Sequence, residues 1–408
     1  MQPAQTDSPA SWGRLAVAMA LSTIGGAGLW TVVVVLPAVQ AEFGADRGSA
    51  SMAYTLTMLG FAAGGVFMGR LSDRFGIMRP VMAAIVALAL GYVLAGLSFS
   101  LWQFSLIQGV LIGALGSATT FGPLLADVSL WFRRRRGIAM ALCASGNYLA
   151  GTFWPPVVQH VMAGSGWRTA YIGVGLFCAV TMLPLALLLR RKPPASAAGE
   201  PVRDDRSPSA MGLSPGALQA MLVLAGLTCC IAMATPQVHI VAYCADLGYG
   251  PAPGAAMLSL MLGFGVVSRV GSGFLADRIG GLPTALLGSV LQAAALLLYV
   301  RFDGLASLYL ISALFGLVQG GIVPSYAVVV RESFPTGEAG TRIGLTMMAT
   351  VIGMAVGGWF AGAVDDWTGS YRASFAAGVA WNAVNVAILL MLLLRQRQQG
   401  FPTLAARG

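Results

Sequence analysis

Long runs without charged residues dominate the chain. They cover 15–41, 48–69, 80–126, 137–167, 169–189, 207–245, 247–268, 279–300, 304–330, 343–364 and 373–394. Each run can supply the roughly 20 apolar residues that an α-helix needs to cross a bilayer. The run 80–126 is long enough for two helices, with a polar turn at Ser98, Phe99 and Ser100. The pattern therefore predicts twelve transmembrane helices.

The composition agrees with an integral membrane protein, because the 408 residues are 57% hydrophobic and only 10% charged. The first apolar run is too long for the core of a signal peptide, so we expect it to remain as helix 1. The sequence holds no phosphate loop, no metal-ligand spacing and no nucleophile with a partner base, which argues against an enzyme, a cofactor or a metal site. We interpret the five cysteines as apolar packing residues: Cys143, Cys178, Cys229, Cys230 and Cys244.

The net charge of +9 could suggest a nucleic-acid partner, but the positions of the 24 basic residues point to a lipid bilayer. Threading the helices alternately through a membrane puts nineteen of them on the side of the N-terminus. This positive-inside pattern predicts a multi-pass protein of the cell (inner) membrane with both termini in the cytoplasm. We also expect a monomer. Four arginines face outward: Arg47, Arg168, Arg301 and Arg372.

The two halves of the chain repeat each other at an offset of 204 residues. The segment 69–76 (GRLSDRFG) matches 273–280 (GFLADRIG), and 167–171 (WRTAY) matches 371–375 (YRASF). A Pro-, Ser- and Ala-rich stretch lies between the halves, and we expect it to be a flexible linker. The sequence therefore predicts an all-α membrane protein of two six-helix bundles related by a pseudo-two-fold axis, with a solute site near the midplane. The predicted parts are 1–192, the linker 193–214, and 215–408.

The loop 69–79 (GRLSDRFGIMR) resembles the signature between helices 2 and 3 of the major facilitator superfamily, with a degenerate copy between helices 8 and 9. The resemblance implies the major facilitator fold and rocker-switch alternating access. The glycines allow close helix approach, and the aspartate can pair with arginines at the cytoplasmic face. We expect a conformational latch formed by Gly69, Asp73, Arg74, Gly76, Asp277 and Arg278.

Further motifs are similar to those of the monocarboxylate transporter and oxalate/formate antiporter branch. They are Gly122-Pro123 through 131–139, 166–171 (GWRTAY), 239–249 and 268–273 (SRVGSG). Gln108 stands where drug–proton antiporters carry an arginine. The stretch 345–360 lacks the second cation of oxalate carriers, and helix 1 lacks the lysine of animal monocarboxylate carriers.

Arg269 is the most informative residue, because it lies well inside the apolar run that follows Pro253. A buried arginine is costly, so it should face the bundle interior or a water-filled path, and its planar fork suits a carboxylate. The alternative is an arginine held by a permanent acidic partner. We interpret the one intramembrane candidate, Asp127, as the partner of the cluster 133–136, which leaves Arg269 as a substrate anchor. One cation balances one carboxylate and favours a monoanion.

The resemblance adds Tyr326 on helix 10 and Phe121 on helix 4 as substrate-site aromatics. His239, which follows a proline in helix 7, has the chemistry for substrate binding and proton coupling, although a hydrogen-bonded packing role is an equal alternative. Other possible lining residues are Asn147, Tyr148, Gln319, Trp30, Tyr54 and Tyr243, although packing or interface anchoring is an equal alternative for Trp30 and Tyr54.

These features together predict a secondary active transporter of a small organic monocarboxylate, with proton coupling as a hypothesis. The alternatives within transport are a dicarboxylate exchanger and an exporter of amphipathic compounds. An alternative of another class is a membrane sensor or scaffold derived from a transporter.

Overall fold

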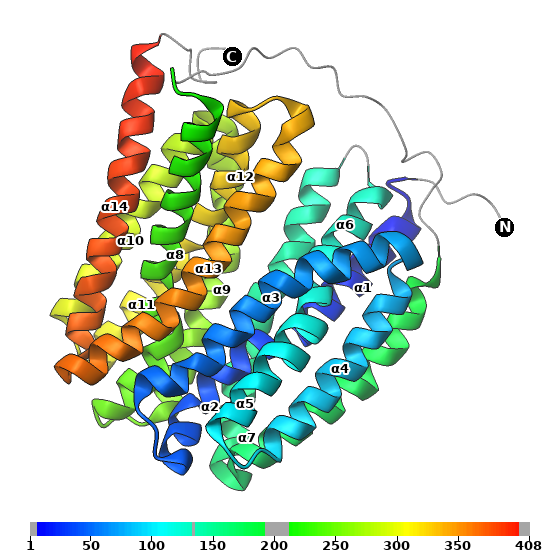
Figure 1. Ribbon diagram of the computed structural model, residues 1–408, viewed down its shortest axis with the longest axis vertical. Helices are drawn as coiled ribbons and strands as arrows, with labels where there is room; N and C mark the ends of the chain where they lie inside the picture. The colour runs from blue at the N-terminus through cyan, green and yellow to red at the C-terminus, as the bar shows by residue number, and fades with distance from the viewer. Residues whose placement is uncertain (1–5, 133–134, 192–211, 400–408) are drawn as a thin grey trace. The chain divides into compact units, whose positions relative to one another are not determined.

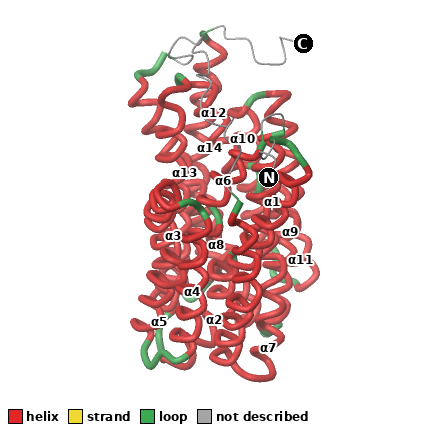
Figure 2. Tube along the Cα trace, turned by 90° about the vertical axis from the view of Figure 1, so that its right-hand side faces the viewer, coloured by secondary structure: helices red, strands yellow, loops and turns green. Residues whose placement is uncertain are grey.

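The computed structural model describes residues 6–132, 135–191 and 212–399, and the regular structure in these ranges is entirely helical (Figure 2). Eleven helical segments of the described chain are long and apolar enough to cross a membrane. One of them, Ile138–Arg190, has 53 residues, whose length of about 80 Å at 1.5 Å per residue exceeds twice the bilayer core. Its backbone leaves the helical region at Gly166 (φ 78°, ψ 164°), so this segment forms two crossings. The predicted twelve helices are confirmed.

The described chain forms two compact units. Unit 1 contains Met1–Glu200 and Val241–Ser259, and unit 2 contains Pro201–Ile240 and Leu260–Gly408. Two helices, α8 (Pro215–Asp246) and α9 (Pro251–Ile279), therefore contribute to both units.

Unit 1 is built around the long helix α7, which packs against α1 and α4 (Figure 1). The first apolar run is divided at Gly26 into α1 and α2, and the fourth crossing contains a π-helix, η1, and a short 3₁₀-helix, η2. The helices of unit 1 are α1 (Pro9–Gly25), α2 (Ala27–Phe43), α3 (Arg47–Phe75), α4 (Met78–Gly96), α5 (Leu101–Ile107), η1 (Gln108–Gly116), η2 (Ser117–Thr120), α6 (Gly122–Trp131), α7 (Arg136–Leu187) and η3 (Leu188–Arg190).

In unit 2, α10 packs against α11, α12 and α14 (Figure 1). The crossing that begins with α11 is interrupted at Gly320 and Gly321 and continues as α12. The helices that lie wholly in unit 2 are α10 (Gly281–Arg301), α11 (Leu305–Gln319), α12 (Ile322–Ser333), α13 (Thr336–Thr368) and α14 (Tyr371–Gln398).

Glycines allow one pair of crossings in each unit to approach closely. In unit 1, a Cβ atom on Gly60 or Gly64 of α3 would collide with the backbone of η1. In unit 2, a Cβ atom on Gly316 or Gly320 would collide with the backbone of α9. Small residues at such contacts are typical of membrane helices, which associate by close packing rather than by the hydrophobic effect.

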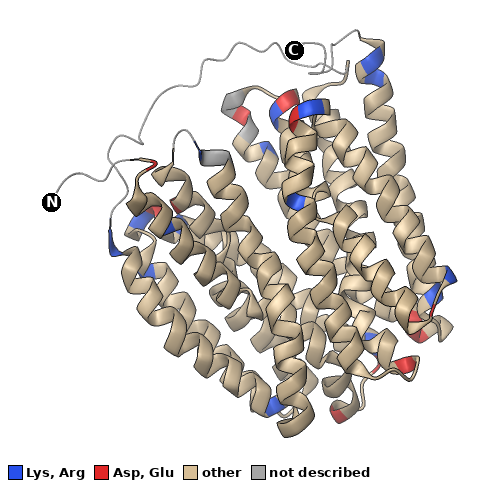
Figure 3. Ribbon diagram, turned by 180° about the vertical axis from the view of Figure 1, so that it is seen from behind, with Lys and Arg blue, Asp and Glu red and all other residues tan. Residues whose placement is uncertain are grey.

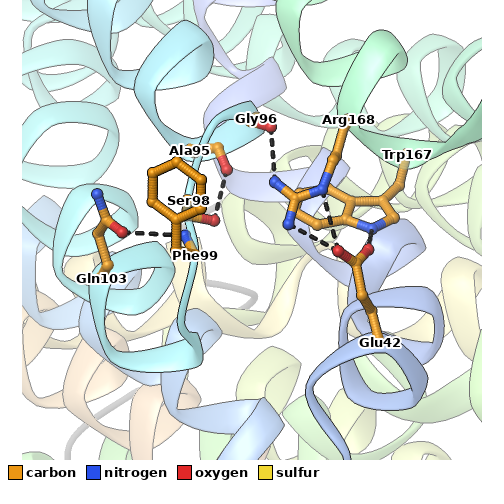
Figure 4. A network of polar contacts seen from close by, with 8 residues as sticks. All are labelled: Glu42, Ala95, Gly96, Ser98, Phe99, Gln103, Trp167 and Arg168. Carbon is orange, nitrogen blue, oxygen red and sulfur yellow. Dashed lines mark hydrogen bonds and ion pairs between the residues drawn. The ribbon is translucent and has the colours of Figure 1, made fainter.

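A cluster of polar contacts connects α2, α4 and α7 in unit 1 (Figure 4). The Glu42 carboxylate accepts hydrogen bonds from Trp167 Nε1 at 2.6 Å and from Arg168 Nη2 at 2.7 Å. Arg168 Nη1 donates to the carbonyl oxygen of Gly96, at the C-terminal end of α4, at 2.8 Å. We call Glu42, Trp167 and Arg168 the corner cluster. Beside it, Phe99 lies in the predicted turn between α4 and α5, and its backbone N–H donates to Gln103 Oε1.

Charged residues occur mostly towards the ends of the helices, and the middle parts of the ribbon are largely without them (Figure 3). Large apolar side chains are exposed between these ends, among them Val180 at 73% and Phe274 at 69%. In water such exposure would be costly, whereas lipid tails are a compatible solvent. The distribution agrees with a protein that spans a bilayer.

Candidate functional site

Arg269 lies on α9, and its side chain is half-buried inside unit 2. Its Nε atom donates to the carbonyl oxygen of Gly320, at 3.4 Å, where α11 is interrupted. Small residues stand near Arg269 on α9, with Gly265 four positions before it and Ser272 three positions after it. The interrupted segment packs against them, because Gly320 contacts the backbone of Gly265 and Gly321 contacts Ser272. The interruption between α11 and α12 thus brings a backbone carbonyl to the arginine.

Gln319 directly precedes Gly320 and forms an amide pair with Gln237 of α8. Gln237 Nε2 donates to Gln319 Oε1 at 2.5 Å, and both side chains are almost completely buried. Gln237 Oε1 and Gln319 Nε2 have no hydrogen-bond partner among the described residues. A buried polar atom without a partner costs about 1–3 kcal/mol. Such atoms in a native protein call for an explanation, and a bound ligand or an ordered water are two of those available.

Gln319 was predicted as a lining residue, but Gln237 was not. A signal for Gln237 was present, since it is a polar residue in the apolar run 207–245, between Pro236 and the candidate His239.

His239 lies in the interior of unit 2, with 3% of its surface exposed. Its Nε2 atom is 2.8 Å from the carbonyl oxygen of Gly358 on α13, and its Nδ1 atom is 3.2 Å from the hydroxyl of Tyr371 on α14. A carbonyl oxygen only accepts, so Nε2 carries a proton, and Nδ1 of the neutral ring accepts from Tyr371. The hydrogen-bonded arrangement that we considered as the alternative is present, and proton coupling stays a prediction.

Tyr326 of α12 is fully buried, and its hydroxyl donates to Asn385 Oδ1 of α14 at 2.6 Å. Asn385 Nδ2 in turn donates to Ser289 Oγ of α10 at 2.8 Å. Tyr326 is thus part of a hydrogen-bonded network with Asn385 and Ser289 on α14 and α10.

The remaining predicted lining residues belong to unit 1. Phe121 is half-buried, with its ring 6.0 Å from that of Phe61. Trp30 Nε1 donates to Asn147 Oδ1 at 3.0 Å, and Tyr148 on the same helix is buried. The contact between Trp30 and Asn147 is the packing role that we considered for the tryptophan.

Asp127 has a different partner from the predicted one. Arg14 of α1 binds both of its carboxylate oxygens, with Nε to Oδ2 at 2.8 Å and Nη2 to Oδ1 at 2.9 Å, and both side chains are buried. Within the predicted cluster, Arg133 and Arg134 lie outside the described residues, and the Arg135 guanidinium lies over the ring of Trp12. The interpretation was wrong because it relied on proximity in sequence, whereas two-point binding by an arginine fork depends on helix packing.

The predicted latch residues lie at and after the ends of α3 and α9. Gly76 has φ 76°, and Gly280, at the matching position of the repeat, has φ 91°. This region of the backbone strongly favours glycine, which explains why both copies of the motif carry it. Within the described chain, no ion pair is formed by Asp73, Arg74, Asp277 or Arg278.

Comparison with known proteins gives the wider context. The family model of the Major Facilitator Superfamily matches residues 18–300 and 270–407. Monocarboxylate transporter 13 of Bos taurus is 33% identical over 334 residues, which cover 79% of this chain and 75% of that protein. Monocarboxylate transporter 11 of Homo sapiens is 28% identical over 403 residues, covering 92% and 82%. The fold is similar to that of a bacterial homolog of the human lysosomal transporter Spinster, solved in an inward-facing and occupied conformation (TM-score 0.71, 14% identity, 98% of each chain).

Proposed function

Because the chain belongs to the Major Facilitator Superfamily and is a secondary transporter, we propose that it carries a small organic monocarboxylate, which Arg269 binds. The observation that carries this proposal is an arginine far inside a membrane helix, next to a helix interruption. A central arginine raises the cost of membrane insertion by roughly 2.5–3.5 kcal/mol, so its presence needs a function. The resemblance to monocarboxylate transporters supports the same class of substrate.

The donor geometry of Arg269 supports a single carboxylate on the substrate. The planar guanidinium offers paired donors that match one carboxylate, and its Nε atom donates to the carbonyl oxygen of Gly320. Gln319, which precedes Gly320 in the chain, and its partner Gln237 have one donor and one acceptor atom without partners among the described residues. We propose that Gln319 binds the substrate with Arg269, and that the other lining residues are Tyr326, His239, Phe121, Asn147 and Tyr148.

The working cycle that we propose is rocker-switch alternating access between the segments 1–192 and 215–408, joined by the linker 193–214. The repeat at offset 204 supports two matching bundles, and the asymmetry of basic residues supports cytoplasmic termini and a place in the cell membrane. We propose that Asp73 and Arg74 act as the latch of one state, and that the carrier works as a monomer.

Proton coupling through His239 is part of the proposal. Protonation of Nδ1 would require the Tyr371 hydroxyl to change from donor to acceptor, so the charge of the histidine is connected to the orientation of this hydroxyl on α14. This arrangement supports a protonation-dependent contact between α8 and α14.

The decisive experiment is uptake of radiolabelled monocarboxylates by the purified protein in liposomes. Arg269→Gln should lower uptake at low substrate concentration by about 100-fold, the loss expected when one partner of a buried charge pair is removed. Arg269→Lys keeps the positive charge but lacks the planar guanidinium. Its uptake should be intermediate between those of the unmodified protein and Arg269→Gln. Arg301→Gln is the matched control in unit 2, because Arg301 is exposed at the end of α10.

Full uptake by Arg269→Gln would contradict the anchor. A parallel measurement of thermal stabilisation by mono- and dicarboxylates separates the substrate classes. Stabilisation by dicarboxylates alone would contradict the monoanion, and stabilisation by amphipathic compounds alone would favour an exporter.

A further inference from the structure

A large cavity lies in unit 1, and its lining contains neither Arg269 nor Gln319, although it includes Gly122, which follows the candidate Phe121. Its volume is about 1090 Å³, and it is bounded by the end of α3, the loop to α4, α6 and η3. Three of the candidate membrane spans end here, at Phe75, Trp131 and Arg190. The cavity is therefore at the depth where a membrane protein passes from lipid tails to headgroups.

The lining is strongly basic. It contains five arginines and two aspartates, and the buried pair of Arg14 and Asp127 neutralises one of each. No described residue forms an ion pair with any of the remaining arginines, although Asp73 also lines the cavity. These four arginines are Arg74, Arg79, Arg190 and Arg191.

The cavity also has an apolar border. Phe75 and Leu130 line it and are 45% and 38% exposed. Leu187 and Leu188, immediately before the cavity residue Leu189, are 53% and 60% exposed. Unpaired cations beside exposed apolar side chains match a ligand that has an anionic head and a hydrocarbon tail.

We propose that this cavity binds the phosphate of an anionic phospholipid headgroup from the adjacent leaflet. Arginine forks bind phosphate oxygens at two points, and four such side chains outnumber the single unpaired aspartate. The acyl chains lie outside the cavity, along Leu187 and Leu188. Inorganic phosphate has the same charged group as the lipid but no hydrocarbon chain that could contact the apolar border. A phospholipid can contact both the arginines and the apolar border, so it is the proposed occupant.

The test uses the full-length protein in detergent, and it measures the shift in unfolding temperature on adding phosphatidylglycerol, phosphatidylcholine or inorganic phosphate. Phosphatidylglycerol should raise the unfolding temperature more than the other two. Arg190→Gln combined with Arg191→Gln should weaken phosphatidylglycerol binding roughly tenfold or more, because each basic residue near the surface contributes to binding of anionic lipid.

The matched control replaces Arg395 and Arg397, two arginines in the last turn of α14, by glutamine. This control should bind phosphatidylglycerol like the unmodified protein. Three results would overturn the proposal: equal stabilisation by phosphatidylcholine, equal stabilisation by inorganic phosphate, and equal weakening in the control. None of these measurements includes a carboxylate substrate, so the result is independent of the proposed transport function.

Discussion

The corner cluster has a counterpart in the second half of the chain, with an acid, an aromatic residue and an arginine at the matching positions. The hydrogen bonds that these residues form differ between the two halves. At offset 204, Glu42, Trp167 and Arg168 correspond to Asp246, Tyr371 and Arg372. In unit 1 the acid accepts from both the tryptophan and the arginine.

In the second half the three residues bond elsewhere. Arg372 Nη2 donates to Asp303 Oδ2 at 2.5 Å, and the Tyr371 hydroxyl lies beside Nδ1 of His239. Asp246 accepts from Arg47 Nη2 at 2.6 Å, both residues being in unit 1.

The difference shows that the contacts of a duplicated unit can diverge while its residue types persist. The acid, aromatic and arginine types persist, yet only the first half uses them as one closed group. In the second half the aromatic hydroxyl is in contact with a titratable histidine, which has no equivalent in the corner cluster. The first half instead contains the buried pair of Arg14 and Asp127, whose counterparts at offset 204 are Leu218 and Arg331. The buried ion pair of unit 1 therefore has no counterpart at the matching positions of the second half, where the Tyr371 hydroxyl instead lies beside His239.

The largest expected effect is on transport driven by a pH gradient. It tests the contact between Tyr371 and His239, which the corner cluster lacks. His239→Gln should abolish accumulation driven by a pH gradient, because the amide cannot change protonation at physiological pH. Exchange of substrate without a gradient should continue. Liposomes with an imposed pH gradient measure both, and Tyr371→Phe separates loss of the ring contact from loss of titration. Unchanged accumulation in His239→Gln would remove this residue from the coupling mechanism.

The next effect concerns the buried ion pair of unit 1. Asp127→Ala should destabilise the protein by about 3–5 kcal/mol, because it leaves the Arg14 charge buried without its partner. Replacing both residues by leucine should restore much of the loss, as Leu218 already stands at the position of Arg14 in the second half. Chemical unfolding in detergent measures the difference.

The control for this pair is Arg331→Ala, at the position that corresponds to Asp127. Arg331 is exposed, so its loss should change stability by less than about 0.5 kcal/mol. Equal destabilisation by Asp127→Ala and Arg331→Ala would show that the buried pair contributes no more to the free energy of unfolding than an exposed arginine.

The smallest expected effect is the difference in stability loss between the corner cluster and the Arg372–Asp303 pair. Glu42→Ala removes a carboxylate that accepts from both Trp167 and Arg168, and because 41% of it is exposed the loss should be about 1 kcal/mol. Asp303→Ala removes the 49% exposed partner of Arg372 alone and should cost less than about 0.5 kcal/mol. Thermal unfolding of the two variants measures the difference, and a larger loss in Asp303→Ala would reverse the comparison.

The sequence predicted the helices and the repeat well because both depend on local patterns. The length of an apolar run decides whether it can cross a bilayer, and the break at Gly166 lies at the end of the predicted run 137–167, just before the run 169–189. The repeat predicted that Gly76 and Gly280 occupy equivalent positions, and both have a positive φ angle in the structure.

Partners distant in sequence could not be predicted in the same way. Asp127 binds Arg14, 113 residues away, and Gln237 binds Gln319, 82 residues away. Choosing such partners requires the rotation of each helix about its own axis. A run that is apolar on every face contains little information about that rotation, because no polar side distinguishes the interior from the lipid.

The burial of the five native cysteines makes the unmodified chain suitable for labelling experiments. All of them, Cys143, Cys178, Cys229, Cys230 and Cys244, are buried. Thiol reagents modify accessible thiolates, so these positions should give little background with a maleimide. A single cysteine introduced at Ala126, which is exposed in the basic cavity, can therefore report water access during the transport cycle without first removing the native thiols.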